Sequence, residues 1–195
     1  MLAYRIFASV PTASPGTPGH ADFTPTGQTS GRWDNADAYR ICYLSLTPEG
    51  AVGEVFGDIP QWKPGMFQAP YLPGSRRELA IFEIPGSLSI LDLDDAQTLV
   101  EQSLRPTQVV IRNPGFTQGF ALRAFRQRTR SGARRWDGIR WWSFHRPYWP
   151  LVALWIAPGD RSPLNLLRVE PLDLDHAAVR DAAKALAREL PPVTT

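Results

Sequence analysis

The feature of the sequence that most constrains the fold is a short strand that runs directly into a helix, within residues 39–56. Side chains from Tyr39 to Leu46 alternate between two sets, with the period of two that predicts a β-strand. Thr47 and Pro48 follow at once. A hydroxyl N-cap before a proline at the first helical position predicts the start of a helix.

The two faces of this strand have different predicted roles. Cys42 and Leu44 share one face. We interpret that face as core, because free cysteine is among the residue types most often buried. Tyr43 then points to the opposite face, where its ring is free to line a site.

The predicted helix carries Gly50, Gly53 and Gly57 at helical spacing. Each glycine inside a helix costs up to about 1 kcal/mol relative to alanine. A helix that bears this cost usually lets another group approach its backbone closely. Glu54 projects beside the glycine side, so we interpret the glycines as room for a substrate. The plainer alternative is that Glu54 is a solvated helix residue.

The remaining elements are predicted from periodicity and turn residues. Further strands are expected at 2–8, 78–84, 87–93, 107–112, 139–143, 151–157 and 164–169, and further helices at 95–104, 117–130 and 176–190. We predict that 78–84 and 87–93 form a hairpin at Pro85 and Gly86. This mixed order, without strict alternation of strand and helix, predicts one α+β domain over residues 1–195.

Composition narrows the class of protein. The net charge of +2 implies no particular partner. The single cysteine rules out an internal disulfide and favours a reducing, cytoplasmic compartment. The start, Met1 to Phe7, has neither a basic segment nor a long apolar run, so we expect no signal peptide. The longest apolar run, 151–157, is too short to span a bilayer, so we expect no membrane association.

Several common site types are missing from the sequence. His20, His145 and His176 are scattered, so we expect no metal site. No glycine-rich phosphate loop and no dinucleotide fingerprint occurs. Ser143 lies two residues from His145, but that spacing does not orient the pair as nucleophile and base.

The segment 123–146 is rich in arginine and offers an alternative of another class. Arg123, Arg126, Arg130 and Arg134 would form a basic stripe, and nearby tryptophans would stack on bases. The chain would then be a non-catalytic module that binds nucleic acid or a protein. We do not expect direct nucleic-acid binding, because the other side of that predicted helix is apolar, so its arginines are explained as a solvated face.

Arg32, Tyr43 and Glu54 place a cation, a ring and a carboxylate on a loop, a strand and a helix. A guanidinium binds phosphate with two parallel hydrogen bonds. A tyrosine ring can stack on a planar heterocycle. A carboxylate beside a ribose stabilises the positive charge that develops as an N-glycosidic bond breaks. Together these roles suit NAD+ as the substrate.

Short motifs occur in a fixed order along the chain: Tyr4-Arg5-Ile6, Gly31-Arg32-Trp33, Tyr43-Leu44-Ser45, Glu54, Trp136-Asp137-Gly138-Ile139-Arg140, Ser143 and Asp175-His176-Ala177-Ala178-Val179. In this order they resemble the RES domain toxins of bacterial toxin–antitoxin pairs, a family named for an Arg, a Glu and a Ser. The resemblance spans nearly the whole chain.

The resemblance implies a split mixed β-sheet with flanking helices, similar to ADP-ribosyltransferase toxins. It implies a toxin that degrades NAD+ at the nicotinamide–ribose bond, by hydrolysis or phosphorolysis, and that a cognate antitoxin protein neutralises. NAD+ would be the substrate, inorganic phosphate a candidate co-substrate, and no cofactor is expected. Some relatives instead transfer ADP-ribose to a protein, which is the alternative within the enzyme class. A homodimer is left open.

Carried onto this sequence, the resemblance implies roles for four residues. Arg32, Glu54 and Ser143 would be the catalytic set. Arg32 would hold the phosphates of the substrate, and Tyr43 would pack on its nicotinamide end. Glu54 would lie at the nicotinamide ribose, and Ser143 would hydrogen-bond the substrate or position Glu54.

Two further residues are implied as substrate contacts, Arg5 and Trp33. The sequence also departs from the family pattern. Asp34 stands where many relatives carry Asn, and Trp141-Trp142 replaces the usual Tyr-Pro before the serine. These departures bear on substrate preference and on the shape of the cleft.

Overall fold

The computed structural model describes residues 1–191, so 192–195 of the predicted domain lie outside the described residues. The strands are β1 (Leu2–Ser9), β2 (Arg40–Ser45), β3 (Arg76–Glu83), β4 (Ile90–Asp92), β5 (Gly138–Trp142), β6 (Pro150–Ile156) and β7 (Asn165–Pro171). The helices are α1 (Pro48–Phe56), α2 (Ala96–Glu101), α3 (Pro106–Val109), α4 (Pro114–Arg126), α5 (Ala177–Ala185) and the 3-10 helix η1 (Pro64–Phe67).

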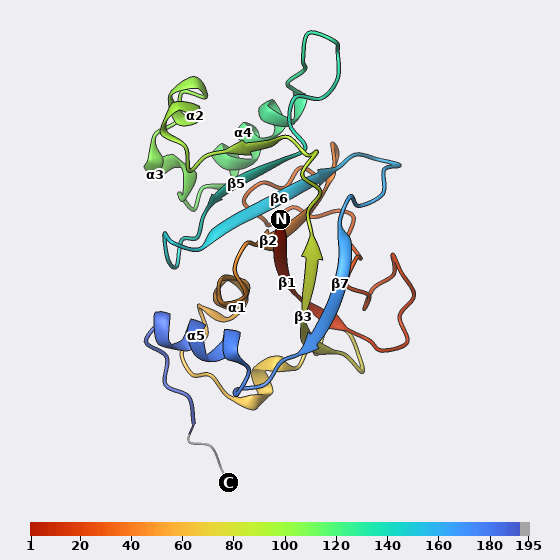
Figure 1. The fold of residues 1–195 in the computed structure, drawn as a ribbon, viewed down its shortest axis with the longest axis vertical. Coiled ribbons are helices and arrows are strands. Elements are labelled where there is room, and N and C mark those ends of the chain that lie inside the picture. Colours follow the sequence, from red (N-terminus) through yellow and green to blue (C-terminus); the bar gives the residue numbers. More distant parts are fainter. Residues whose placement is uncertain (192–195) are drawn as a thin grey trace.

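All strands of the described part join one sheet in the order β4-β5-β6-β2-β1-β3-β7 (Figure 1). β4 and β5 are parallel and the other neighbours are antiparallel, which confirms the predicted mixed α+β architecture. β1 pairs with β3 along its whole length. With β2, by contrast, β1 is paired at Tyr4 and Ser45 alone within the described residues. The sheet is therefore split between β1 and β2.

The helices cover one face of the sheet in two groups, and each group encloses a core cluster (Figure 1). The first cluster joins α2, α3 and α4 to β2, β5 and β6, and includes Trp33, Trp141 and Trp155. The second joins α1 and α5 to β1 and β3, and includes Phe56 and Trp149. Loops cover the opposite face of the sheet.

The strand-to-helix stretch forms as predicted. The Thr47 Oγ1 accepts a hydrogen bond of 3.1 Å from the Gly50 N–H, which caps the first turn of α1. Cys42 is 1% exposed and packs in the cluster on the opposite face of the sheet, which confirms it as core. Tyr43 points to the face that carries the helices, against the first core cluster.

Two predictions about strands are wrong. The segments around Pro85 form no hairpin, because β1 and β7 already occupy both edges of β3, and β4 pairs instead with β5. The predicted strand 107–112 begins as the short helix α3, where Pro106 occupies the first helical turn.

Helix boundaries also differ from prediction. The last helix begins after His176, whose Nδ1 accepts from the Ala178 N–H and caps the first turn. This helix ends at Ala185, and Ala187 adopts a positive φ of 51° just beyond it.

Two findings limit the kinds of site in the described chain. No helix within residues 1–191 has the length and apolar character needed to cross a bilayer. The same residues hold no cluster of three or more His, Cys, Asp or Glu side chains with a geometry that could bind a metal ion.

Candidate functional site

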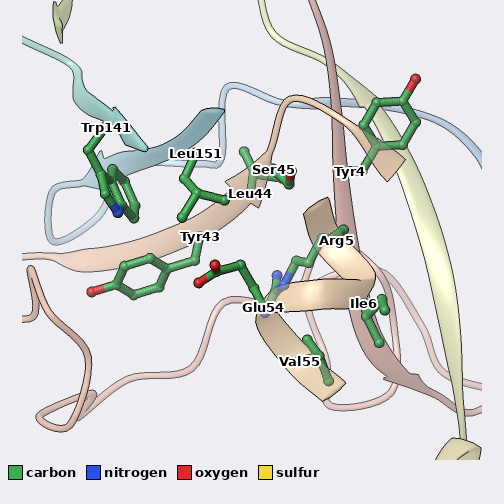
Figure 2. Close-up of a pocket in the computed structure, with 11 residues that line it drawn as sticks. Tyr4, Arg5, Ile6, Tyr43, Leu44, Ser45, Glu54, Val55, Trp141 and Leu151 are labelled. Atoms are coloured by element: carbon green, nitrogen blue, oxygen red, sulfur yellow. The ribbon is translucent and has the colours of Figure 1, made fainter. Parts of the chain in front are cut away.

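A cavity of about 270 Å³ lies at the split of the sheet, beneath α1 (Figure 2). Trp141 and Leu151 of the first core cluster form one part of its wall. Tyr4 and Ile6, packed on the second cluster, form another part. The cavity therefore lies where the two groups of helices meet. Its volume is near the lower end for small-molecule sites, which commonly start at about 300 Å³.

Glu54 extends from α1 into this cavity, toward Tyr43 (Figure 2). Its Oε1 accepts a hydrogen bond of 2.5 Å from the hydroxyl of Ser143, just after β5. The Ser143 oxygen in turn accepts from the backbone N–H groups of His145, at 3.0 Å, and Arg146, at 3.4 Å. Ser143 is 1% exposed, so its hydroxyl is a fixed anchor for one carboxylate oxygen. The other oxygen, Oε2, has no hydrogen-bond partner among the described residues.

The glycines of α1 admit a protein side chain, which corrects the prediction that they make room for substrate. A Cβ at Gly53 would lie 2.1 Å from the ring of Trp149, and a Cβ at Gly50 would lie 2.4 Å from Ser45 Oγ and 3.3 Å from the Trp149 Cβ. At Gly57 the neighbour is the ring of His145, at 2.8 Å. The glycines of α1 therefore allow neighbouring side chains to pack closely on the helix that carries Glu54.

Trp149 holds the candidate site together, and sequence reasoning missed it. It is 0% exposed, and its ring packs directly on Gly53, one residue before Glu54. Its backbone oxygen accepts a 2.9 Å hydrogen bond from the Ser143 N–H. One residue therefore fixes α1 and the segment after β5 relative to each other, which brings Glu54 and Ser143 together. The signal in the sequence was the glycine spacing of α1.

Tyr43 serves as a scaffold for the loop before β2. Its hydroxyl donates to Asp34 Oδ1 at 2.7 Å and accepts from the Trp33 N–H at 2.9 Å. Asp34 Oδ2 accepts from the Gly31 N–H at 2.6 Å. A Cβ at Gly31 would lie 2.6 Å from the Tyr43 hydroxyl, so only glycine fits there. Asp34, which stands where many members of the family carry Asn, is therefore part of this buried network.

The environment of Tyr43 keeps its hydroxyl protonated. Burial raises the pKa of Tyr43 strongly, and the negative charge of Asp34 raises it further. The ring lines the cavity while the hydroxyl is turned into the Asp34 network (Figure 2). The face of the ring is the part that remains available to a ligand.

Arg32 is half-buried and engaged by the protein. Its Nη1 donates to the carbonyls of Val109, at 2.9 Å, and Ile111, at 2.7 Å, and its Nη2 donates to Val110 at 3.3 Å. Burial lowers the pKa of Arg32, and the nearby charge of Glu54 opposes that effect. Arg32 thus joins the loop before β2 to the end of α3, and it contributes positive charge near Glu54.

The two other predicted substrate contacts lie differently. Trp33 is 1% exposed and packs edge-on against Phe120 and Trp141, with ring centroids 6.2 and 5.6 Å apart. Trp33 is therefore a core residue and not a wall of the cavity, which corrects that placement. Arg5 lines the cavity, but its Nη1 donates to the carbonyl of Phe23 at 2.9 Å and so also ties down the N-terminal loop.

The predicted arginine stripe does not form on one helix. α4 ends at Arg126, so Arg130 and Arg134 belong to the turn that follows. Arg134 lies 3.8 Å from Asp137 and 3.9 Å from Asp160. The arginines of this segment are thus divided between exposed positions and ion pairs.

The comparisons with known proteins agree with this fold. The chain is similar in structure to a toxin–antitoxin complex, "Crystal structure of the M.tuberculosis MbcT-MbcA toxin-antitoxin complex", with a TM-score of 0.60 and 14% sequence identity over 95% of this chain and 88% of that chain. Comparison by sequence with curated proteins gives no match. The family model of the RES domain matches residues 2–187. Because that match covers nearly the whole chain, this protein belongs to the RES domain family.

Proposed function

We propose that this protein cleaves the nicotinamide–ribose bond of NAD+ and acts as the toxin of a toxin–antitoxin pair. The observation that carries the proposal is the Glu54 carboxylate, held by buried Ser143 and projecting into a cavity walled by the Tyr43 ring. A carboxylate with one oxygen anchored and the other free can face a reacting sugar without reorganising.

The chemistry follows from that carboxylate. As the bond between C1′ of the ribose and the nicotinamide nitrogen breaks, its electron pair leaves with nicotinamide, which becomes neutral. The ribose ring develops oxocarbenium-like positive charge, which the negative charge of Glu54 stabilises. Water or phosphate then adds to C1′, and its proton goes to the surrounding solvent or to Glu54. The products are nicotinamide and ADP-ribose, or nicotinamide and an ADP-ribose phosphate ester.

The size of the cavity supports one part of the dinucleotide as its occupant. About 270 Å³ suits the nicotinamide ribose but not the whole of NAD+. In this arrangement the Tyr43 ring packs against the planar nicotinamide, and Glu54 lies beside the ribose (Figure 2). The rest of the substrate would extend from the mouth of the cavity.

The proposal of an antitoxin partner rests on family membership and on a structural neighbour. The chain matches the RES domain model over residues 2–187, and the similar solved structure is named as a toxin–antitoxin complex. An enzyme that consumes a central cofactor would harm its own cell, so a protein that blocks the cavity is the partner that the proposal requires.

The test is release of nicotinamide from NAD+ by the pure protein, followed by chromatography with and without inorganic phosphate. We expect release by the wild type and an acceptor-dependent second product, either ADP-ribose or its phosphate ester. In cells, expression of the wild type should deplete NAD+ and stop growth. A wild type that releases no nicotinamide under either condition would overturn the proposal. If label from NAD+ instead remained on a protein, the reaction would be transfer of ADP-ribose to that protein and not hydrolysis or phosphorolysis.

A further inference from the structure

A second, smaller cavity has two arginines in its wall. It measures about 180 Å³ and is lined by Arg32, Arg112, Asn113 and the start of α4. No carboxylate of the described residues lines it. The two guanidiniums are close enough that the charge of Arg112 lowers the pKa of Arg32. The wall is therefore positive, and its charge is not matched by an acid within the cavity.

Arg32 is poorly placed to bind an anion with its full set of donors. Three backbone carbonyls, those of 109, 110 and 111, already accept its Nη hydrogens. These bonds use three of the five N–H donors of the guanidinium, which leaves Nε and one Nη2 hydrogen for an anion. The charge of Arg32 favours an anion nearby, but a full set of hydrogen bonds requires donors from another residue.

Arg112 has more free donors than Arg32. Its guanidinium carbon lies 4.2 Å from the ring centroid of Phe144, so the group is oriented by stacking. Its Nη2 lies 3.8 Å from Asp58 Oδ1, with side chains 63% and 80% exposed, and such an exposed pair is weak. Arg112 makes no hydrogen bond to any residue within 1–191.

The anchors of Arg112 come from the two segments that carry the candidate catalytic pair. Phe144 directly follows Ser143, and Asp58 lies four residues after Glu54, just beyond the end of α1. The two segments that carry Glu54 and Ser143 therefore also hold the guanidinium of Arg112. Arg32 is a neighbour of both cavities, because it lines the smaller one and is acted on by the charge of Glu54 in the larger one.

We propose that Arg112 is the residue that binds a phosphate group next to the Glu54–Ser143 pair, with Arg32 as a fixed neighbouring charge. The phosphate comes either from the pyrophosphate of the dinucleotide or from inorganic phosphate as co-substrate. A planar guanidinium with free N–H groups matches a phosphate in both charge and geometry. The α4 N-terminus adds little, because Asn113 Oδ1 already accepts from the Phe116 N–H. This inference rests on the proposed function for its substrate.

The experiment measures binding by calorimetry with two phosphate-bearing probes, ADP-ribose and inorganic phosphate. We compare the wild type with Arg112→Ala, Arg112→Lys and the matched control Arg126→Ala, an exposed arginine in the last turn of α4. Arg112→Ala should weaken ADP-ribose binding about ten-fold, the scale of a lost charge-assisted hydrogen bond. Arg112→Lys should lose less, because it keeps the charge, and Arg126→Ala should bind as the wild type does.

The arms of the experiment separate the two sources of the phosphate. A ten-fold loss for ADP-ribose assigns the site to the pyrophosphate of the dinucleotide. A loss confined to inorganic phosphate assigns it to the co-substrate. Asp58→Asn removes the competing carboxylate and should tighten binding by about two-fold.

Equal affinities of wild type and Arg112→Ala for both probes would overturn the inference, as would a wild type that binds neither probe. Failure of the proposed function looks different. In that case no nicotinamide is released from NAD+, while ADP-ribose or phosphate still binds in an Arg112-dependent manner. Because Arg112 is exposed, its variants should melt at the temperature of the wild type, which shows that lost binding is not lost folding.

Discussion

Two hydrogen-bonded pairs flank the cavity, and they differ in what they leave free. Tyr43 and Asp34 are both engaged: the hydroxyl has two partners, and each carboxylate oxygen has one. Ser143 and Glu54 form the second pair, in which the serine is buried and saturated, and the exposed carboxylate keeps one oxygen without a partner in the described chain. Buried polar groups must be satisfied, so the first pair is suited to structure. The second pair is suited to chemistry because it holds one oxygen and frees the other.

The sharpest test of this comparison is Glu54→Gln. The amide keeps the shape of the side chain but removes the charge that the proposed oxocarbenium-like ribose requires. We expect nicotinamide release to fall about 1,000-fold, the upper scale for loss of a preorganised electrostatic group. The melting temperature should change little, since Glu54 is exposed.

The matched control for that variant is Glu49→Gln, in the first turn of the same helix and outside the cavity lining. It should keep nearly full activity. Equal activities of Glu54→Gln and the wild type would remove Glu54 from the mechanism and end the distinction between the two pairs.

Tyr43→Phe tests the pair formed by Tyr43 and Asp34, to which we assign a structural role. The variant keeps the ring that lines the cavity but leaves the Trp33 N–H unpaired and Asp34 with one fewer donor. We expect the free energy of unfolding to fall by about 3 kcal/mol, because a buried charge loses a partner. Chemical denaturation measures this. A variant that is fully stable but inactive would reverse the roles we assign to the two pairs.

Gly53→Ala tests whether Trp149 places the catalytic pair. Alanine would favour the helix by about 1 kcal/mol, but its Cβ would meet the Trp149 ring at 2.1 Å. An overpacked core site costs up to about 3 kcal/mol, so we expect a net loss of about 2 kcal/mol. Combining Gly53→Ala with Trp149→Phe should give a smaller loss than the two single losses added together. Simple additivity in the double variant would show that the two residues do not interact.

Ser143→Ala separates the effect of positioning the Glu54 carboxylate from the effect of its charge. The carboxylate of Glu54 remains, but its anchor is lost, so the turnover number should fall about ten-fold with little change in KM. Steady-state kinetics of nicotinamide release at several NAD+ concentrations distinguish the two parameters. A large rise in KM with unchanged turnover would instead mean that Ser143 contacts the substrate.

The smallest effect concerns pH. Folding raises the pKa of Tyr43, so the native state holds its proton at pH values where the unfolded chain loses it. The associated stability is present below about pH 10, the ordinary pKa of tyrosine, and is lost as pH rises above it. At pH 10 the loss is about 0.4 kcal/mol, and it grows with pH. Denaturation between pH 8 and 11 should show a shallower decline for Tyr43→Phe than for the wild type.

Local signals in the sequence were sufficient for part of the fold. The alternation that ends at Ser45 and the cap formed by Thr47 and Pro48 depend on neighbouring residues, and both elements form as predicted. Pairing of β4 with β5 depends on which strand edges remain unoccupied, and no local signal carries that information. The predicted hairpin at Pro85 failed for this reason.

In the candidate site, too, the sequence predicted some features and not others. Residue type and motif order predict Arg32, Tyr43, Glu54 and Ser143. The structure brings Tyr43, Glu54 and Ser143 together at the larger cavity, and it places Arg32 in the wall of the smaller one, near enough for the charge of Glu54 to act on it. Their partners were not predictable, because hydrogen bonds to backbone carbonyls 109–111 involve a segment nearly eighty residues from Arg32.

The sequence by itself determined the residue types of the site, the strand that carries Tyr43 and the helix that carries Glu54, because caps and periodicity act over a few residues. Only the tertiary structure decided which groups are free to act. Trp149 fills the glycine side of α1, Asp34 occupies the hydroxyl of Tyr43, and carbonyls occupy Arg32. A buried donor or acceptor must find a partner wherever the fold places one, and that choice is made by packing between distant segments.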